Sequence, residues 1–182
     1  ERMKVMIGTL KKQGCEENDP FLSDLEERYK VYADSVNAAR QAEFEANNPG
    51  YVARRLYEEG KYKEAIKKYQ EALEKEEDPE KKADNLLGIA SIQFRKLNSY
   101  SAARTNARKA AQLRENWGAP YMLIGDMYAN TSRNCGKDKD GWGQSLAVLA
   151  ALQKYRYARS IDPEVAEAAN QKIPLYSGSK PT

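Results

Sequence analysis

Hydrophobic residues recur three and four positions apart along most of the chain, a spacing that predicts α-helices. In residues 1–13, one face of such a helix carries Met3, Met6, Ile7 and Leu10. Asp19 and Pro20 then form a helix-start signal, because Asp caps a first turn and Pro is tolerated within it. A long helix is therefore expected over residues 20–46, with an apolar seam for a neighbouring helix at Leu22, Leu25, Tyr29, Tyr32, Val36 and Ala39.

From residue 49 onward the pattern repeats, and each unit reads as two helices joined by a tight turn. Gly60 lies at the turn of the first unit, and Asn98 takes the place of that glycine in the second. Ala65 and Ala103 occupy equivalent positions 38 residues apart, and Ala151 is their equivalent in the third unit.

These alanines have a packing reason. Two antiparallel helices approach closely only where one presents Ala or Gly to the other, with a bulky side chain a turn away to fill the gap. We therefore expect Ala65, Ala103 and Ala151 to be buried. Tyr69 and Tyr155 are the expected fillers, whereas Ala107 leaves the middle unit underfilled.

The segment from about Tyr51 to Pro163 resembles the tetratricopeptide repeat (TPR). Its first-helix motif is matched by Tyr121, Ile124, Gly125 and Tyr128, and its second-helix motif by Ala151, Tyr155, Ala158 and Pro163. The resemblance implies an all-α fold, a right-handed α-solenoid of about three TPR helix pairs with a C-terminal capping helix. The first 48 residues do not match the repeat, and their pattern predicts an additional N-terminal helical hairpin. The corresponding ranges are a hairpin at 1–48, an array at 49–182, an insertion at 130–144 and a capping helix at 163–176.

The combination of "PYMLIGDMYA", "ARSIDP" and "EAANQKI" is similar to a group of bacterial cell-envelope TPR proteins. This likeness implies a periplasmic setting or the periplasmic side of the outer membrane. The chain starts at Glu1 with neither Met nor a signal peptide, which favours a mature or trimmed fragment.

The amino-acid composition excludes several classes of partner and active site. The 182 residues carry a net charge of +3, too small to indicate a nucleic-acid or membrane partner. No apolar run approaches the roughly 20 residues that span a bilayer. Histidine is absent, which removes the commonest general base and metal ligand. We therefore expect no catalytic residues, no metal and no cofactor.

The two cysteines, Cys15 and Cys135, both lie in polar loops beside a glycine. They are interpreted as two unrelated thiols, a cross-link between chains, or one disulfide formed outside the cytosol. A disulfide within the chain requires the hairpin to fold back along the array, because the α-carbons must lie roughly 6 Å apart.

The stretch "SRNCGKDKDGWG" (132–143) contains a fragment of a calcium-loop pattern. With Gly141 at the sixth loop position, the first and twelfth positions fall on Gly136 and Ala147, which offer no side-chain oxygen. We therefore interpret the stretch as an insertion between two helices. Trp142 is expected to fold back over the helix pair, or alternatively to contact a partner.

The run 94–114 contains six basic residues and no acid, and Arg104 and Arg108 lie one helical turn apart. This pattern has two interpretations: a patch for nucleic acid or another anionic surface, or the solvated outer face of a second helix. The acid-rich stretch 71–84 favours the second, so no nucleic-acid partner is expected.

TPR first helices line a concave surface, so the resemblance implies a protein or peptide partner bound there or on the inserted loop. The expected partner-binding residues are Arg54, Tyr57, Glu58, Asn85, Ile92, Arg95, Lys96, Met122, Asp126, Asn130 and Trp142. The function predicted is a non-enzymatic interaction scaffold. The alternatives are a structural homodimer formed through the 22–39 seam, and a helical glycosidase acting through carboxylates alone.

Overall fold

A computed structural model describes residues 2–16, 19–132 and 141–177, and all regular structure in these ranges is helical. Helix accounts for 86% of the residues that the structure describes, which confirms the all-α fold class. The chain divides into two compact units, Glu1–Asn48 and Pro49–Thr182, which are described separately below.

The first unit contains α1 (Arg2–Lys12) and α2 (Pro20–Asn47). The predicted cap is confirmed, because the Asp19 carboxylate accepts hydrogen bonds from the backbone N–H groups of Phe21 and Leu22, at 2.9 and 3.0 Å. α1 packs against α2, and Lys11 Nζ lies 2.8 Å from Glu26 Oε1. The predicted seam is only partly covered, since Leu22 is buried while Tyr32 and Ala39 are exposed.

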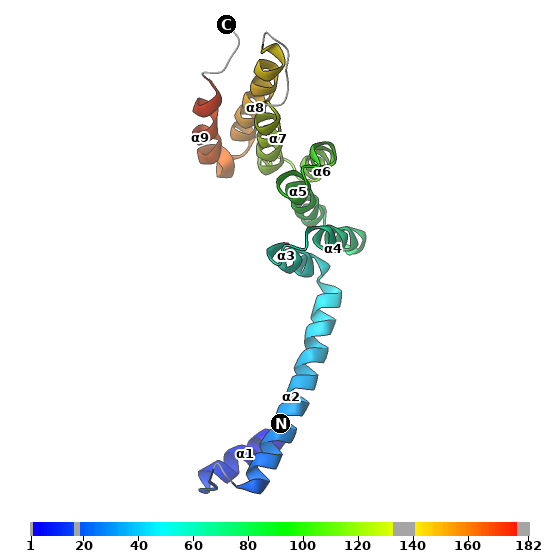
Figure 1. The fold of residues 1–182 in the computed structure, drawn as a ribbon, viewed down its shortest axis with the longest axis vertical. Helices are drawn as coiled ribbons and strands as arrows, with labels where there is room; N and C mark the ends of the chain where they lie inside the picture. The colour runs from blue at the N-terminus through cyan, green and yellow to red at the C-terminus, as the bar shows by residue number, and fades with distance from the viewer. Residues whose placement is uncertain (1, 17–18, 133–140, 178–182) are drawn as a thin grey trace. The chain divides into compact units, whose positions relative to one another are not determined.

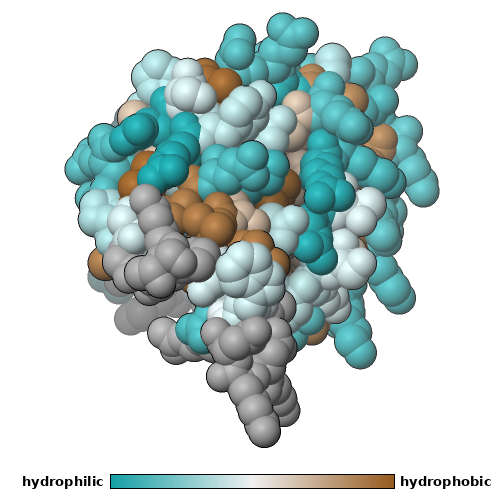
Figure 2. Space-filling view, turned by 90° about the horizontal axis from the view of Figure 1, so that it is seen from above, coloured by the Kyte–Doolittle hydropathy of each residue, from teal (hydrophilic) through white to brown (hydrophobic). Residues whose placement is uncertain are grey.

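The second unit contains three helix pairs and a terminal helix (Figure 1). α3 (Pro49–Glu58) packs with α4 (Tyr62–Lys75), α5 (Pro79–Arg95) with α6 (Tyr100–Leu113), and α7 (Ala119–Thr131) with α8 (Trp142–Ile161). A 3-10 turn at Pro163–Val165 then leads into α9 (Ala166–Ser177), which packs on α8. On the face drawn in Figure 2, hydrophobic residues form small patches among hydrophilic ones.

Both predicted turns have the backbone conformation that was expected. Gly60 has φ 78° and Asn98 has φ 53°, which is the left-handed region that favours glycine and tolerates asparagine. Asn98 therefore replaces the turn glycine in conformation as well as in sequence position.

The small-residue prediction is confirmed. Ala65, Ala103 and Ala151 are all 0% exposed. Two glycines lie against the rings of the filler tyrosines. A Cβ added to Gly125 would lie 2.5 Å from Tyr155 Cε1, and one added to Gly88 would lie 3.0 Å from Tyr69 Cζ. Each filler ring thus lies directly on the backbone of a neighbouring helix, so neither glycine can gain a methyl group without a shift of the ring.

Three buried clusters follow one another through the second unit, and each joins residues of one pair to the helix that follows it. The first includes Ala65, Tyr69 and Ile92. The second includes Phe94, Ala103 and Met127, and the third includes Met122, Tyr155 and Ala169 of α9. The core therefore continues through successive pairs into the terminal helix.

Asp162 fixes the corner after α8. Its Oδ2 accepts a hydrogen bond from the Gly118 backbone N–H at 2.7 Å, and its Oδ1 accepts one from the Glu164 N–H at 2.9 Å. The carboxylate is 6% exposed, so both bonds form away from water, where an unpaired charge would be costly. This residue joins the start of α7 to the turn before α9.

The predicted insertion is shorter than expected, because α7 continues to Thr131 and α8 begins at Trp142. Trp142 is 56% exposed, and its closing over the helix pair stays a prediction. Cys135, Asp138 and Asp140 lie outside the described residues. Cys15 is a half-buried free thiol, and its pairing with Cys135 stays a prediction.

Candidate functional site

A groove of about 640 Å³, hereafter the groove, lies on the second unit. It runs across the first helix of each pair, α3, α5 and α7, and reaches the 3-10 turn and α9. Its lining residues are Arg54, Tyr69, Asp84, Leu87, Gly88, Ser91, Arg95, Ala119, Met122, Leu123, Asp126, Val165, Ala168 and Lys172.

One face of α5 supplies the middle of the groove. Asp84, Gly88, Ser91 and Arg95 are four, three and four residues apart, so they follow one side of the helix from its first turns to its last. Ser91 leaves room there because its side chain is short, whereas the Tyr69 ring occupies the space beside Gly88. Apolar atoms of Leu87, Met122 and Leu123 line the groove beside them.

Two arginines border the groove on α3 and α5. Arg54 and Arg95 are exposed, and neither forms an ion pair with a carboxylate in the described part of the chain. Burial raises the pKa of the Tyr69 hydroxyl, while the charge of Arg54 and its hydrogen bond to that hydroxyl act in the opposite direction. Arg54 is therefore held at the groove, and its remaining donors are available to a ligand.

An ion pair closes the other end. Lys172 Nζ of α9 lies 2.6 Å from Asp126 Oδ1 of α7, and the same oxygen accepts a hydrogen bond from the Tyr155 hydroxyl at 2.9 Å. Burial raises the pKa of Tyr155, and the negative charge of Asp126 raises it further. Lys172 also lies 5.6 Å from the Tyr155 ring centroid, so cation–π attraction reinforces this contact.

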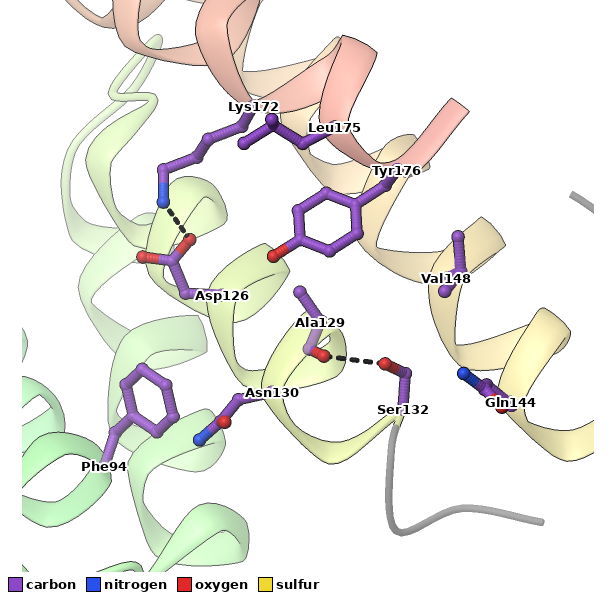
Figure 3. A pocket seen from close by; sticks show the side chains of 10 residues that line it. All are labelled: Phe94, Asp126, Ala129, Asn130, Ser132, Gln144, Val148, Lys172, Leu175 and Tyr176. Carbon is purple, nitrogen blue, oxygen red and sulfur yellow. Dashed lines mark hydrogen bonds and ion pairs between the residues drawn. The ribbon is translucent and has the colours of Figure 1, made fainter. Parts of the chain in front are cut away.

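A second hollow of about 520 Å³, the side pocket, lies beyond this ion pair between α7, α8 and α9 (Figure 3). Asp126 and Lys172 line both hollows, so their ion pair forms the partition between them. The Tyr176 ring projects into the pocket from α9, and it stacks on Tyr155 with 6.1 Å between ring centroids. On the opposite wall, the Ser132 hydroxyl donates to the backbone oxygen of Ala129 at 2.7 Å.

Of the predicted partner-binding residues, the groove brings together Arg54, Arg95, Met122 and Asp126. Asn130 lines the side pocket, and its Nδ2 donates to the Tyr100 hydroxyl at 3.1 Å. The other predicted residues line neither hollow: Tyr57, Glu58, Asn85, Ile92, Lys96 and Trp142.

Tyr57 and Lys96 form a separate cluster with Tyr62. The Lys96 ammonium lies 5.7 and 5.4 Å from the ring centroids of Tyr57 and Tyr62, and the two rings are 5.7 Å apart. These residues fasten the end of α5 to the turn between α3 and α4. Asn85 is half-buried against Gly50, where an added Cβ would meet its Oδ1 at 3.3 Å.

Two predicted residues are buried, contrary to the prediction that they face a partner. Ile92 is 2% exposed and belongs to the first core cluster, because it lies on the side of α5 that packs on α3 and α4. Met122 is 8% exposed and packs in the third cluster, so only its edge reaches the groove.

Sequence reasoning missed Tyr69, Ser91 and Lys172 as groove residues. Lys172 had a detectable signal, because the inward positions of the terminal helix recur at Val165, Ala169, Lys172 and Tyr176 with helical spacing. Because that helix was interpreted only as a cap, the lysine at one of its inward positions was not considered as a groove residue.

Within the described ranges, no three His, Cys, Asp or Glu side chains come together as a metal site would need. None of the helices described is both long and apolar enough to cross a membrane. No protein-family model and no curated protein matches the sequence.

Proposed function

We propose that this chain is a non-enzymatic scaffold that holds a segment of another protein in the groove. The observation that carries the proposal is the groove itself, which crosses α3, α5, α7 and α9. It combines apolar walls with two arginines that have no carboxylate partner among the described residues. An extended peptide or a helix fits such a surface, because it reaches several helices at once and exchanges water for both apolar and charged contacts.

We also propose that the helix pairs form a right-handed TPR solenoid. The buried alanines at equivalent positions, the left-handed turn residues Gly60 and Asn98, and the Tyr155 ring packed on Gly125 support this relationship. In such a solenoid the first helices line the inner surface, in agreement with the elements that line the groove. The sequence likeness to cell-envelope TPR proteins supports a bacterial periplasmic or outer-membrane-associated location.

The carboxylate-based glycosidase is a weaker proposal, although Asp84 and Asp126 both line the groove. A hydrolase of that kind needs one carboxyl group to donate a proton to the leaving group. Asp126 Oδ1 instead accepts from Tyr155 and Lys172, and Asp84 lies 3.7 Å from Arg114. Both carboxylates therefore have cationic partners, an arrangement that favours recognition over proton transfer.

The test is selection of peptides from a random display library on the full chain, followed by affinity measurement on variants. Arg54→Ala/Arg95→Ala removes both groove cations, and Ser91→Tyr fills the floor. We expect each change to weaken the selected peptides at least about tenfold, equivalent to ~1.4 kcal/mol. Tyr57 is left unchanged, because its cluster with Tyr62 and Lys96 holds the helices together.

The matched control is Lys67→Ala/Lys109→Ala, which removes two exposed cations of second helices, neither of which lines the groove. Selected peptides should bind this control as they bind the unchanged chain. If the groove variants bind the selected peptides with the same affinity as the unchanged chain, the proposal is contradicted.

Self-association through α2 is a second candidate, favoured by four exposed apolar side chains. Phe21, Val31, Tyr32 and Phe44 are 61%, 65%, 51% and 46% exposed. Light scattering on the full chain tests it: a dimer mass that returns to one chain in Val31→Asp/Tyr32→Asp supports the dimer. A single-chain mass at every concentration rejects it.

A further inference from the structure

The basic run of α6 meets α7 at a cluster around Tyr128, to which α8 adds the charge of Lys154 and which the groove does not include. Arg104 and Arg108 lie one turn apart on α6, Tyr128 lies on α7, and Lys154 lies on α8. Tyr128 is two residues from Asp126, about 200° around the helix, so it lies on a different side of α7 from the groove residue.

The side chains in this cluster are ordered by aromatic rings. The Arg104 guanidinium lies over the Tyr128 ring, with its Cζ 5.3 Å from the centroid. The Lys154 ammonium lies 5.8 Å from the centroid of Tyr121, whose ring meets Tyr157 edge-on at 4.7 Å. Stacking of this kind holds flexible cationic side chains in place, so less entropy is lost when they bind an anion.

Three cations act on the single hydroxyl of Tyr128. Its pKa is lowered chiefly by a hydrogen bond from Arg104, then by the charges of Arg104, Arg108 and Lys154, while desolvation acts in the opposite direction. With Arg104 as the donor to the phenol oxygen, the O–H proton of Tyr128 remains a donor for another group.

No carboxylate balances these charges in the part of the chain that the structure describes. None of the three cations takes part in an ion pair there, and α6 and α8 contain no Asp or Glu. Elsewhere on the second unit, the exposed Lys61 and the half-buried Lys68 and Arg114 each have an acidic partner. Like charges held together without a counter-charge attract an anion.

We propose that Arg104, Arg108, Lys154 and Tyr128 form a binding site for a phosphate- or sulfate-type oxyanion, either free or as the ester of a larger molecule. A guanidinium provides paired N–H donors that match two oxygens of such an anion, and Lys154 and the Tyr128 O–H provide further donors. Arg104 and Lys154 are half-buried, so the ligand is shielded from water more than one on a flat basic surface.

The direct test is a titration of the full chain with inorganic phosphate, and separately with sulfate, at constant ionic strength. The arginine Nε–Hε signals are followed by NMR. We expect saturable shifts that Arg104→Gln/Arg108→Gln/Lys154→Gln abolishes. Tyr128→Phe keeps the ring under Arg104 and removes one donor, so it should weaken binding by about threefold to tenfold, and unchanged binding would contradict the role of this hydroxyl.

The matched control is Lys67→Gln/Lys109→Gln/Arg156→Gln. This variant loses the same three charges from exposed positions on α4, α6 and α8. It should bind phosphate within about twofold of the unchanged chain, because these exposed side chains are not part of the Tyr128 cluster and act on the anion only through charge that water and salt screen. Equal losses in both triple variants, or unchanged binding after removal of Arg104, Arg108 and Lys154, would overturn the site.

A second arm distinguishes the source of the anion. Vesicles of phosphatidylglycerol are compared with vesicles of phosphatidylcholine for the unchanged chain and both triple variants. Phosphate binding without vesicle binding indicates a free anion, and binding of both that is lost with Arg104, Arg108 and Lys154 indicates a headgroup ester. Vesicle binding without any phosphate or sulfate binding would contradict a defined oxyanion site. The Tyr128→Phe result keeps the test decisive if the triple variant does not fold.

Discussion

The two units of the chain are both helical, yet different interactions hold their helices. In the first unit, one described residue, Leu22, is buried, while Val5, Met6, Phe21, Val31, Tyr32 and Phe44 remain exposed. Its helices rely on local devices such as the Asp19 cap and the pair between Arg28 Nε and Asp24 Oδ2 at 2.8 Å. In the second unit, every pair buries alanines and an aromatic ring at the contact between helices.

This difference shows that helix content says little about what a region can do. A binding groove needs side chains held at fixed separations on several helices, and only close packing between helices provides this. The second unit meets that requirement at Arg54, Ser91, Arg95 and Asp126. Substitutions in each unit should therefore have different effects on stability.

The largest contrast is expected from adding one methyl group to a glycine of each unit. Gly125→Ala drives a Cβ to 2.5 Å from Tyr155, whereas Gly8→Ala in α1 meets nothing within 4 Å. Gly125→Ala should lower the free energy of unfolding by about 3 kcal/mol, and Gly8→Ala should raise local helix stability by about 1 kcal/mol. Calorimetry measures the first and circular dichroism the second. If both substitutions changed stability in the same direction, the proposed difference in packing between the units would be contradicted.

Removing a tyrosine hydroxyl should also lower the unfolding free energy more in the second unit than in the first, by a smaller difference than the glycine substitutions. Tyr155 is 0% exposed and donates to Asp126, so Tyr155→Phe should cost about 1–2 kcal/mol of unfolding free energy. Tyr32 is 51% exposed, so Tyr32→Phe should change that free energy by less than about 0.5 kcal/mol. Denaturant titration checks both variants. An unchanged unfolding free energy in Tyr155→Phe would mean that the hydrogen bond to Asp126 does not stabilise the partition between the two hollows.

Loss of the cap of α2 should instead destabilise the first unit and leave the second unit unchanged. Asp19→Ala removes the acceptor for two backbone N–H groups and should cost about 1 kcal/mol, confined to the first unit. Asp34→Ala, in the exposed middle of the same helix, is the control for loss of one charge. Hydrogen exchange should show faster opening at the start of α2 in Asp19→Ala only. Faster exchange throughout the second unit would show that the units are coupled.

The smallest effect is expected in alkaline solution. Since the folded-state pKa of Tyr155 is raised, the unfolded chain loses this proton first, and stability is fully present below pH of about 10 and declines above it. The decline attributable to this residue should be under about 1 kcal/mol at pH of about 10.5. Tyr155→Phe should show a shallower decline than the unchanged chain. Identical slopes would mean that Tyr155 does not keep its proton on folding.

Local rules predicted much of the fold because the deciding interactions are close in sequence. The cap at Asp19 and the turn at Asn98 depend on neighbouring backbone groups, and Ala65 and Ala151 follow a repeated packing contact. These features could be predicted without any knowledge of how distant helices meet.

The site was only partly predictable because its geometry depends on distant helices. Ile92 lies on the apolar side of α5, but only the positions of α3 and α4 decide that this side is buried. Lys172 reaches Asp126 across 46 residues of sequence, and no local pattern pairs them. The cation cluster at Tyr128 likewise requires α6, α7 and α8 together.

The central claim, that the groove of the second unit holds a partner, is tested most directly by site-specific photo-crosslinking in cells that make the protein. A photoreactive phenylalanine analogue is placed singly at Ser91 in the groove, at Lys67 on α4 or at Val31 on α2. The account predicts a discrete adduct with another protein from Ser91 and none from Lys67 or Val31. An adduct from Val31 with none from Ser91 would move the binding surface to the first unit and contradict the account.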